Sequence, residues 1–443
     1  MEESRKGRRP SRCSQHGDLN CFALPNQGDD STVPLQLNHV RSQFPSLQEH
    51  YDGVPAVFCD SPGGSQMPES VVMAMQEYLG RFMANTGGQF ATSIATDEVV
   101  AEAHRLAADF MHCAPQEVVF GANMTNLTYL ISRSVGRTLS HGDEIIVSEL
   151  DHEANIAPWL QMAEERNLVV HWARIDRETC TLNLEQLRSL IGRRTRLIAL
   201  GLASNFSGSV NPVAHIATWA RAAGAMVYVD AVHYAPHGLL DVRALDCDFL
   251  VTSAYKHFGP HLGVLYGKER HLNRLPAYQV RAHDGSLPGK FEIGTSNFEA
   301  LAGFCACIQY ISSLAAGDPE LLISASRRDM IVTAFGLIRE HERNLMTRFL
   351  EGLRNLAGYR LYGRTAVTDR VPTFALRREG TTPRQLAVHL AERNIFAWDG
   401  NFYALAVAEA LGVEQSGGVL RIGFAHYNTE NEVDTVLEAL DSV

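Results

Sequence analysis

The sequence predicts an α/β fold, with a large domain built on a mostly parallel sheet and a smaller C-terminal α/β domain. Between residues 117 and 267, short apolar runs rich in Val and Ile alternate with amphipathic segments. This order is typical of a parallel sheet whose two faces are covered by helices. The chain of 443 residues, 45% of them hydrophobic, is also long enough to bury one large core and a smaller one.

The expected elements follow one another from about residue 69. Helical spacing of apolar residues predicts helices over 69–83 and 97–111. The strands of the large domain are expected over 117–120, 144–148, 169–175, 196–201, 226–230, 248–253 and 263–267. The helices between them are expected over 126–138, 156–166, 184–191 and 212–224. A helix over about 330–356 leads to the small domain, formed by the segments 371–377, 382–394, 419–428 and 429–440.

We expect three parts along the chain. Residues 1–33 are polar, rich in Arg, Ser, Gly and Asp, and lack apolar periodicity, which is typical of a disordered tail. Residues 34–315 form the large domain, whose N-terminal segment can pack on the small domain. Residues 316–443 form the small C-terminal domain.

Charge and cysteine usage narrow the class of protein. The net charge of −11 argues against a general nucleic-acid binder. The eight cysteines form no CxxC pair and no metal-type cluster with histidine, so we expect reduced thiols and no metal site. No uncharged apolar stretch approaches the roughly 18 to 20 residues that span a bilayer, and the N-terminus has no apolar signal core. We therefore predict a soluble, cytoplasmic protein without nucleic-acid or membrane partners.

Polar side chains stand at the ends of several expected strands, where ligands bind in open α/β sheets. Asp230 ends the run MVYVD, and Lys256 follows DFLVTSAY. Taken alone, the aspartate can cap the next segment and the lysine can be a surface charge. Together they suit pyridoxal 5'-phosphate (PLP), which needs a lysine for its Schiff base and a carboxylate beside its pyridine nitrogen. Lys256 would then be both imine partner and proton carrier.

Four longer stretches resemble the class V aminotransferases of fold type I, and especially their cysteine desulfurase branch. They are DHEANIAPW (151–159), VDAVHYAPHGLLDVRALDCDFLVTSAYKHFGP (229–260), EIGTSN (292–297) and LRIGFAHYNT (420–429). The resemblance runs from about Phe44 to the C-terminal segment. It implies the fold of a fold type I PLP-dependent transferase and PLP as the cofactor.

The resemblance implies roles around the cofactor ring. Lys256 matches the lysine of the internal aldimine, Asp230 the partner of the pyridinium nitrogen, and His152 the imidazole stacked on the ring. A lone histidine is otherwise a hydrogen-bonded structural group. Asn205 and His233 stand where the family places donors to the ring hydroxyl, and His233 replaces a glutamine common in desulfurases.

The resemblance also implies a phosphate site. Thr125 and the Met124 amide lie at the start of a helix, where phosphates bind. Ser253 adds a hydroxyl, and Tyr255 stands where desulfurases often have histidine. Thr295 resembles a threonine that reaches the phosphate of the neighbouring subunit, which implies a homodimer with shared active sites.

The substrate side departs from the desulfurase pattern. Arg421 resembles the arginine that grips the α-carboxylate of a small amino-acid substrate, a task that suits a guanidinium. Desulfurases carry a catalytic cysteine on a mobile loop, and Tyr403 stands about there, whereas Cys307 is the last cysteine. Tyr403 either lines the substrate pocket or packs in the small-domain core, as do Trp398 and Phe402.

The chain is therefore expected to act on an amino acid through an external aldimine and a quinonoid, with Lys256, His152 and Asp230 as catalytic residues. We favour a C–S lyase that works by β- or γ-elimination, because this reaction needs no protein nucleophile. Epimerisation or racemisation at Cα and transamination are alternatives within the same family. A catalytically silent binding protein is a further alternative. A nicotinamide dehydrogenase is disfavoured because the turn after EVVF lacks GxGxxG.

Overall fold

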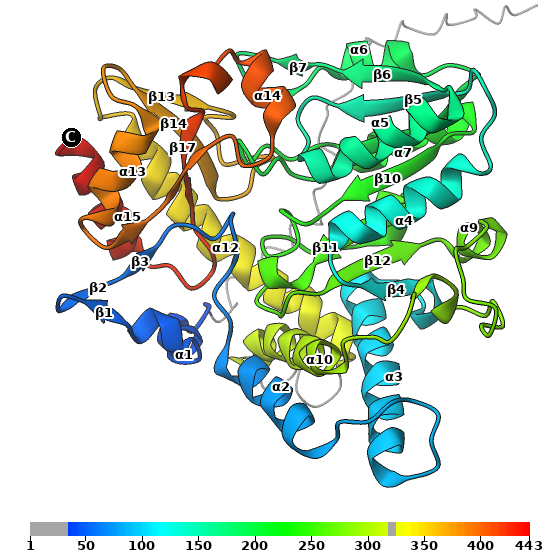
Figure 1. The fold of residues 1–443 in the computed structure, drawn as a ribbon. Coiled ribbons are helices and arrows are strands. Elements are labelled where there is room, and N and C mark those ends of the chain that lie inside the picture. The colour runs from blue at the N-terminus through cyan, green and yellow to red at the C-terminus, as the bar shows by residue number, and fades with distance from the viewer. Residues whose placement is uncertain (1–33, 318–324) are drawn as a thin grey trace, which may run out of the picture. The chain divides into compact units, whose positions relative to one another are not determined.

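The computed structural model describes residues 34–317 and 325–443. These residues form one compact unit with two larger sheets (Figure 1). The polar tail predicted over 1–33 lies outside the described residues. The boundary predicted between residues 315 and 316 stays a prediction.

The larger sheet has seven strands and is mostly parallel, as predicted. Their order across the sheet is β4 (Val118–Gly121), β12 (Gly263–Gly267), β11 (Phe249–Ser253), β10 (Met226–Asp230), β9 (Thr195–Gly201), β5 (Glu144–Ser148) and β6 (Val169–Ala173). Within this sheet, β12 runs antiparallel to both of its neighbours. The other neighbouring strands pair in parallel. The carboxyl ends of β5, β9, β10 and β11 therefore share one edge.

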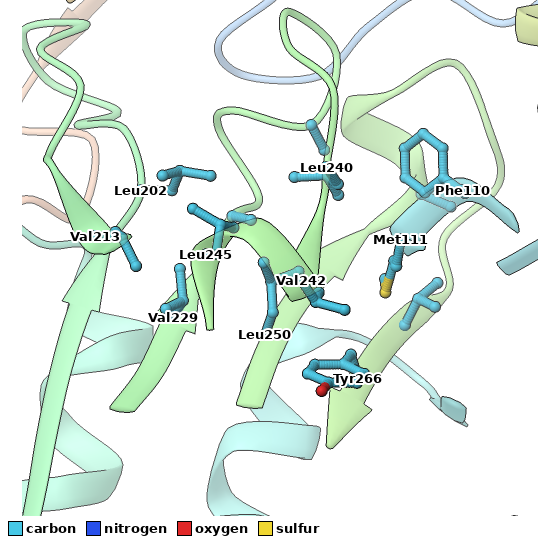
Figure 2. Close-up of a cluster of buried hydrophobic side chains, with 14 of the residues drawn as sticks. Phe110, Met111, Leu202, Val213, Val229, Leu240, Val242, Leu245, Leu250 and Tyr266 are labelled. Carbon is cyan, nitrogen blue, oxygen red and sulfur yellow. The ribbon is translucent and has the colours of Figure 1, made fainter. Parts of the chain in front are cut away.

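Successive side chains of each strand enter two different cores, because neighbouring residues of a strand point to opposite faces. In β10, Tyr228 packs on one face and Val229 on the other. The Val229 face contains the cluster shown in Figure 2, where Leu250 of β11 lies beside Val242 and Leu245. Burial on both faces explains why these strands are almost continuously apolar in the sequence.

Helices cover both faces. They are α4 (Met124–Gly136), α5 (Ala157–Arg166), α6 (Leu184–Leu190), α7 (Val213–Ala223), α8 (Val242–Leu245) and α9 (Glu269–Arg274). Helix α4 begins where the Asn123 side chain accepts a hydrogen bond from the Asn126 N–H at 2.9 Å. This N-cap turns the chain from the end of β4 into the helix beside the shared strand edge.

Three further helices pack together beside this sheet: α2 (Glu69–Arg81), α3 (Ala91–Met111) and α10 (Phe298–Ser313). Helix α3 begins six residues before the start predicted from the sequence. Among the described residues, Phe298–Ala316 is long and apolar enough to cross a membrane, but 67% of that stretch is buried inside the structure. Its packing against α2, α3 and α12 is that of a core helix.

The smaller sheet is antiparallel. Its strands lie in the order β13 (Tyr359–Tyr362), β14 (Thr373–Arg378), β17 (Val419–Gly423) and β16 (Trp398–Gly400). The helices α12 (Arg327–Leu353), α13 (Pro383–Ala391) and α15 (Glu430–Asp441) pack together with it, and α14 (Leu405–Ala410) follows β16. Among the elements not expected from the sequence are β13, β16 and α10.

The N-terminal segment lies beside the smaller sheet without adding a strand to it. It contains α1 (Leu37–Ser42), β1 (His50–Tyr51), β2 (Val54–Pro55) and β3 (Val57–Phe58). Strand β3 pairs in parallel with β15 (Ile395–Phe396), and Asp60 bridges to Gly423 at the end of β17. This pairing places the turn after residue 60 beside Arg421.

Candidate active site

A cavity of about 790 Å³ lies at the shared carboxyl edge of the large sheet. The large sheet, the N-terminal segment and the 398–421 region all contribute to its lining. The predicted site residues found in its lining are Met124, Thr125, His152, Asn205, Asp230, His233, Ser253, Tyr255, Lys256, Tyr403 and Arg421. Thr295 is exposed and lies outside this lining, so its role toward a neighbouring subunit stays a prediction.

Lys256 follows β11 and extends into the cavity, where its ammonium group donates a hydrogen bond to the carbonyl of Pro62. Burial, followed by the positive charge of Arg421, lowers the pKa of Lys256 to about 7, while Asp230 and Asp60 oppose the shift. A lysine with this pKa is largely a neutral amine just above neutral pH. It can therefore act as a nucleophile and a base.

Asp230 ends β10, and its Oδ1 accepts a hydrogen bond from the Val232 N–H at 2.9 Å. Burial raises the pKa of Asp230 to about 6, although this hydrogen bond and Lys256 both favour the charged form. The neighbouring Asp151 accepts hydrogen bonds from the Gly201 N–H at 2.9 Å and the Asn155 amide at 2.7 Å. Burial and then the charge of Asp230 raise the pKa of Asp151 to about 7. A positively charged ring nitrogen of a bound cofactor would stabilise the charged form of Asp230.

His152 follows β5, and its Nδ1 accepts a hydrogen bond from the Ala154 N–H at 3.0 Å. Nδ1 is therefore the unprotonated nitrogen. Burial, followed by the charges of Lys256 and Arg421, lowers the pKa of His152 to about 4. The imidazole is thus neutral at physiological pH. Its ring lies 5.6 Å from that of Tyr403, at 35°.

Asn205 and His233 are already partly engaged. The Asn205 amide donates to the Phe402 carbonyl at 2.9 Å, and its buried Oδ1 has no partner within the described residues. His233 pairs through Nε2 with the Thr373 hydroxyl at 3.0 Å. Burial and the nearby His237 lower the pKa of His233 strongly, so this ring is also neutral.

The N-terminus of α4 forms a polar end to the cavity. The Met124 N–H donates to the Ser253 hydroxyl at 3.1 Å, and Thr125 follows on the same turn. A Cβ atom on Gly263 would lie 2.5 Å from the Asn123 backbone, so glycine at this position allows β12 to approach the helix start. Hydroxyls and helix N–H groups gathered in this way suit a phosphate.

Arg421 lies in β17, on the opposite side of the cavity from the start of α4, and is 4% exposed. Its guanidinium donates to the Asn205 carbonyl at 2.9 Å and lies 3.9 Å from the centroid of the Phe402 ring. Its buried Nε has no partner within the described residues. Burial lowers the pKa of Arg421 to about 9, whereas Asp60 and Tyr255 favour its charged form. A carboxylate would supply the missing counter-charge.

The segment after β16 brings aromatic side chains to the cavity. Trp398, Phe402 and Tyr403 all line it, and Trp398 and Tyr403 are 55% and 73% exposed. Phe402 and Tyr403 have φ angles of 57° and 58°. Two consecutive aromatic residues in this left-handed region cost about 1 kcal/mol or more each. All three therefore lie on the cavity wall, and Phe402 also packs against the large core cluster.

The sequence analysis assigned no role to several cavity groups. Asp60 follows β3, and burial raises its pKa to about 6, with Arg421 and Lys256 opposing the shift. The backbone of Pro62 and Gly63 also lines the cavity, as do Glu153 and Tyr129. The stretch FCDSPGG contains an acid and two glycines in a turn, which is the signal that could have indicated a backbone contact.

The arrangement fits PLP. A lysine and a buried carboxylate stand at adjacent strand ends, and a helix start with two hydroxyls lies at one end of the cavity. The unpaired Oδ1 of Asn205 and Nε of Arg421 leave polar groups for a ligand. When bound, PLP would be held by Lys256, Asp230 and the start of α4.

Several known proteins are similar to this chain along most of its length. The family model of class V aminotransferases matches residues 57–319 and 330–436. The aminotransferase-like protein FGM3 of Gibberella zeae is 32% identical over 424 residues, which cover 93% of this chain and 100% of that protein. A cysteine desulfurase of Serratia proteamaculans is 30% identical over 427 residues, covering 93% and 99%.

Solved structures are similar along nearly the whole chain. A cysteine desulfurase of Thermococcus onnurineus, in its apo form, has a TM-score of 0.82 and 26% identity, covering 93% of this chain and 98% of that one. The cysteine desulfurase CsdA of Escherichia coli has a TM-score of 0.77 and 28% identity, covering 92% and 98%.

Proposed function

Because the chain belongs to the class V aminotransferase family, whose members are PLP-dependent enzymes of fold type I, we propose that it is a PLP-dependent C–S lyase. In this reaction the Cα proton of a sulfur-containing amino acid is removed and the bond from carbon to sulfur breaks. The sulfur leaves with a proton as a thiol or sulfide. The remaining enamine takes up water and yields a 2-oxo acid and ammonia.

The observation that carries this proposal is the combination of groups in the cavity. Lys256, Asp230 and Arg421 line it, but none of the six described cysteines does. Cys59 and Cys307 are fully buried, and burial raises the pKa of both thiols. Within the described residues, the site therefore holds a base and a carboxylate anchor without a thiolate that could accept sulfur.

The chain's own residues divide the work. PLP, when bound, supplies an electron sink for the electron pair left at Cα. The Lys256 amine takes the Cα proton and returns a proton to the leaving group or the product. Arg421 fixes the substrate carboxylate and thereby orients the Cα–H bond. Asp230 stabilises positive charge on the ring nitrogen, and neutral His152 offers an uncharged face to the ring.

The 401–404 segment supports elimination over sulfur transfer. Tyr403 stands in the segment where the desulfurase pattern has a mobile cysteine. Here the Tyr403 carbonyl accepts from the Glu153 N–H at 2.7 Å, and the Tyr403 N–H donates to the Asn401 side chain at 3.0 Å. The Asn401 amide in turn donates to both Glu414 carboxylate oxygens at 3.0 Å. A segment pinned in this way is poorly suited to carry a persulfide between two sites.

We also propose that the enzyme is a cytoplasmic homodimer with shared active sites. Large exposed apolar side chains gather in three stretches: on α2 and just after it, at the start of α3 and along 278–293. They are Val72, Met73, Leu79, Met83, Phe90, Ile94, Tyr278, Val280 and Ile293. Thr295 follows directly on the third stretch, which favours a second copy as the covering partner. Light scattering coupled to size-exclusion chromatography tests this, and a monomer at micromolar concentration would contradict it.

The lyase proposal is tested on the purified protein with a panel of L-cysteine, cystine, S-alkyl cysteines and L-methionine. Visible absorbance, 2-oxo acid, ammonia and sulfide or thiol are measured together. We expect a yellow protein that releases 2-oxo acid, ammonia and the sulfur product in equal amounts. Release of 2-oxo acid without sulfur product would indicate transamination, and a change of optical rotation alone would indicate epimerisation. Either result, or a colourless inactive protein, would contradict the proposal.

A further inference from the structure

Resting on this proposed function, we infer that the preferred substrate carries a bulky aromatic group on its sulfur atom. The aromatic rim formed by Trp398, Phe402 and Tyr403 would hold this group. The inference goes beyond free cysteine, whose small side chain needs no such surface. It follows from four features of the described residues.

The first feature is the position of two rim residues, Phe402 and Trp398, around Arg421. Phe402 lies under the guanidinium of Arg421, 3.9 Å from ring centroid to Cζ. Trp398 of β16 is the cross-strand partner of Arg421 in β17, so the two side chains project from the same face of the smaller sheet. A substrate carboxylate held by Arg421 therefore has aromatic surface on two sides.

The second feature is the exposure of these rings and the strained backbone that carries two of them. Tyr403 is 73% exposed and Trp398 is 55% exposed, although both line a cavity. Both residues of the Phe402–Tyr403 pair adopt the left-handed backbone conformation. Hydrogen bonds from Asn205 and Glu153 to the two carbonyls hold the pair in this conformation. Strain maintained at a cavity mouth indicates a side chain aimed for binding.

The third feature is the space left for Trp398. A Cβ atom on Gly63 would lie 2.8 Å from the indole Nε1 and 3.1 Å from the Asp60 carbonyl. The absence of a side chain at Gly63 thus lets the indole lie against the 60–63 turn. The cavity of about 790 Å³ is near the upper end of the about 300–1,000 Å³ usual for small-molecule sites. It has room for a large substituent beside PLP and the amino-acid core.

The fourth feature is the charge at the outer end. The Glu153 carboxylate lines the cavity and has no ion-pair or hydrogen-bond partner among the described residues. Burial and then the charge of Glu409 raise its pKa. When Arg421 is paired with the substrate α-carboxylate and Lys256 is bonded to the cofactor, the Glu153 carboxylate leaves this end of the cavity negatively charged. An anionic substituent is therefore repelled, and a neutral or cationic aromatic group is preferred.

The test compares S-benzyl-L-cysteine, S-methyl-L-cysteine and S-carboxymethyl-L-cysteine on the holoenzyme. Two quantities are measured: the rate of pyruvate release, and the concentration that half-saturates the visible absorbance change. We expect kcat/KM for the benzyl compound to exceed that for the methyl compound by roughly 10- to 100-fold, the gain from burying one aromatic ring. The carboxymethyl compound should be the poorest of the three.

Variants show which side chain is responsible for the preference for the benzyl compound. Tyr403→Ala should reduce the benzyl-to-methyl ratio by roughly tenfold, whereas Tyr403→Phe should keep most of it. Tyr51→Ala, at an exposed tyrosine outside the cavity lining, should leave the ratio unchanged. Equal or better use of the methyl compound by the wild type would overturn the inference while leaving the lyase proposal intact. The benzyl compound could also half-saturate the absorbance change at a lower concentration than the methyl compound while no pyruvate is released. That result would support the inference and contradict the lyase proposal.

Discussion

The two sides of the cavity differ in how the chain builds them. On the inner side, Asp230 ends β10, and Lys256 lies in the turn that follows the adjacent parallel strand β11, whose residues are all buried. On the outer side, Arg421, Trp398 and the turn after Asp60 come together through pairing between segments far apart in the chain. The inner side suits a fixed cofactor, and the outer side suits a variable substrate.

This difference has a physical basis. The inner residues are held by strands buried on both faces, so their positions vary little once the sheet forms. The outer residues lie on an antiparallel sheet, on an N-terminal segment and on a strained turn, which can change without disturbing the large core. Reaction type and substrate choice can therefore be separated by mutation.

The largest expected effect comes from Lys256→Ala on the inner side. It removes the only lysine that lines the cavity within the described residues, so turnover should fall by roughly 10²- to 10⁴-fold or more. The visible absorbance band should be lost as well. Steady-state assays and absorbance spectra check both. Lys290→Ala, outside the cavity lining, is the control, and a Lys256→Ala protein with normal activity would refute its assigned role.

A somewhat smaller effect is expected for Asp230→Ala. Without this carboxylate, positive charge on the cofactor nitrogen is no longer stabilised, so turnover should fall by roughly 10²- to 10³-fold and PLP should be retained weakly. Dialysis followed by PLP quantification measures retention, with Asp434→Ala, a surface carboxylate paired with Arg348, as control. Near-normal turnover would show that Asp230 only caps its turn.

On the outer side, Arg421→Lys should act mainly on substrate binding. A lysine keeps the charge but loses the two-pronged geometry, so KM should rise by roughly 10- to 100-fold with a smaller change in kcat. PLP content should stay close to that of the wild type. Equal loss of PLP and of substrate affinity would show that the two sides are not separable. Arg348→Lys, at a surface ion pair, serves as control.

The smallest expected effect is a shift in pH dependence that links the two sides. Lys256 is charged below its pKa of about 7 and neutral above it. The rate at which apoprotein binds PLP covalently should therefore rise about tenfold per pH unit below pH 7 and then level off. Because the charge of Arg421 lowers the pKa of Lys256, Arg421→Gln should move this midpoint to higher pH. Rapid-mixing absorbance measurements check it, and an unchanged midpoint would contradict the electrostatic link.

The inner side was predictable from sequence because a simple rule applies: ligands bind beyond the carboxyl ends of parallel strands. Asp230, Lys256 and Ser253 follow apolar runs that are readily recognised as strands, and the structure places all three at the cavity. Their individual roles toward PLP stay predictions. The mostly parallel sheet was predicted for the same reason, because burial on both faces leaves a strong apolar signal.

The outer side of the cavity was harder to predict from the sequence. No local pattern indicates that Asp60 bridges to Gly423, because this contact depends on long-range pairing of β3 with β15. The left-handed backbone at Phe402 and Tyr403 is likewise invisible in sequence, since aromatic residues rarely adopt it. Thus Tyr403 was located by resemblance, whereas its pinned and strained geometry was found only in the structure.

The central claim is that Lys256 anchors the cofactor at the inner end of this cavity. The most direct test is to reduce the purified protein with sodium borohydride and locate the modification by peptide mass spectrometry. We expect a reduced phosphopyridoxyl group on the peptide that contains Lys256. A group on another lysine, or an unmodified protein after incubation with PLP, would contradict it.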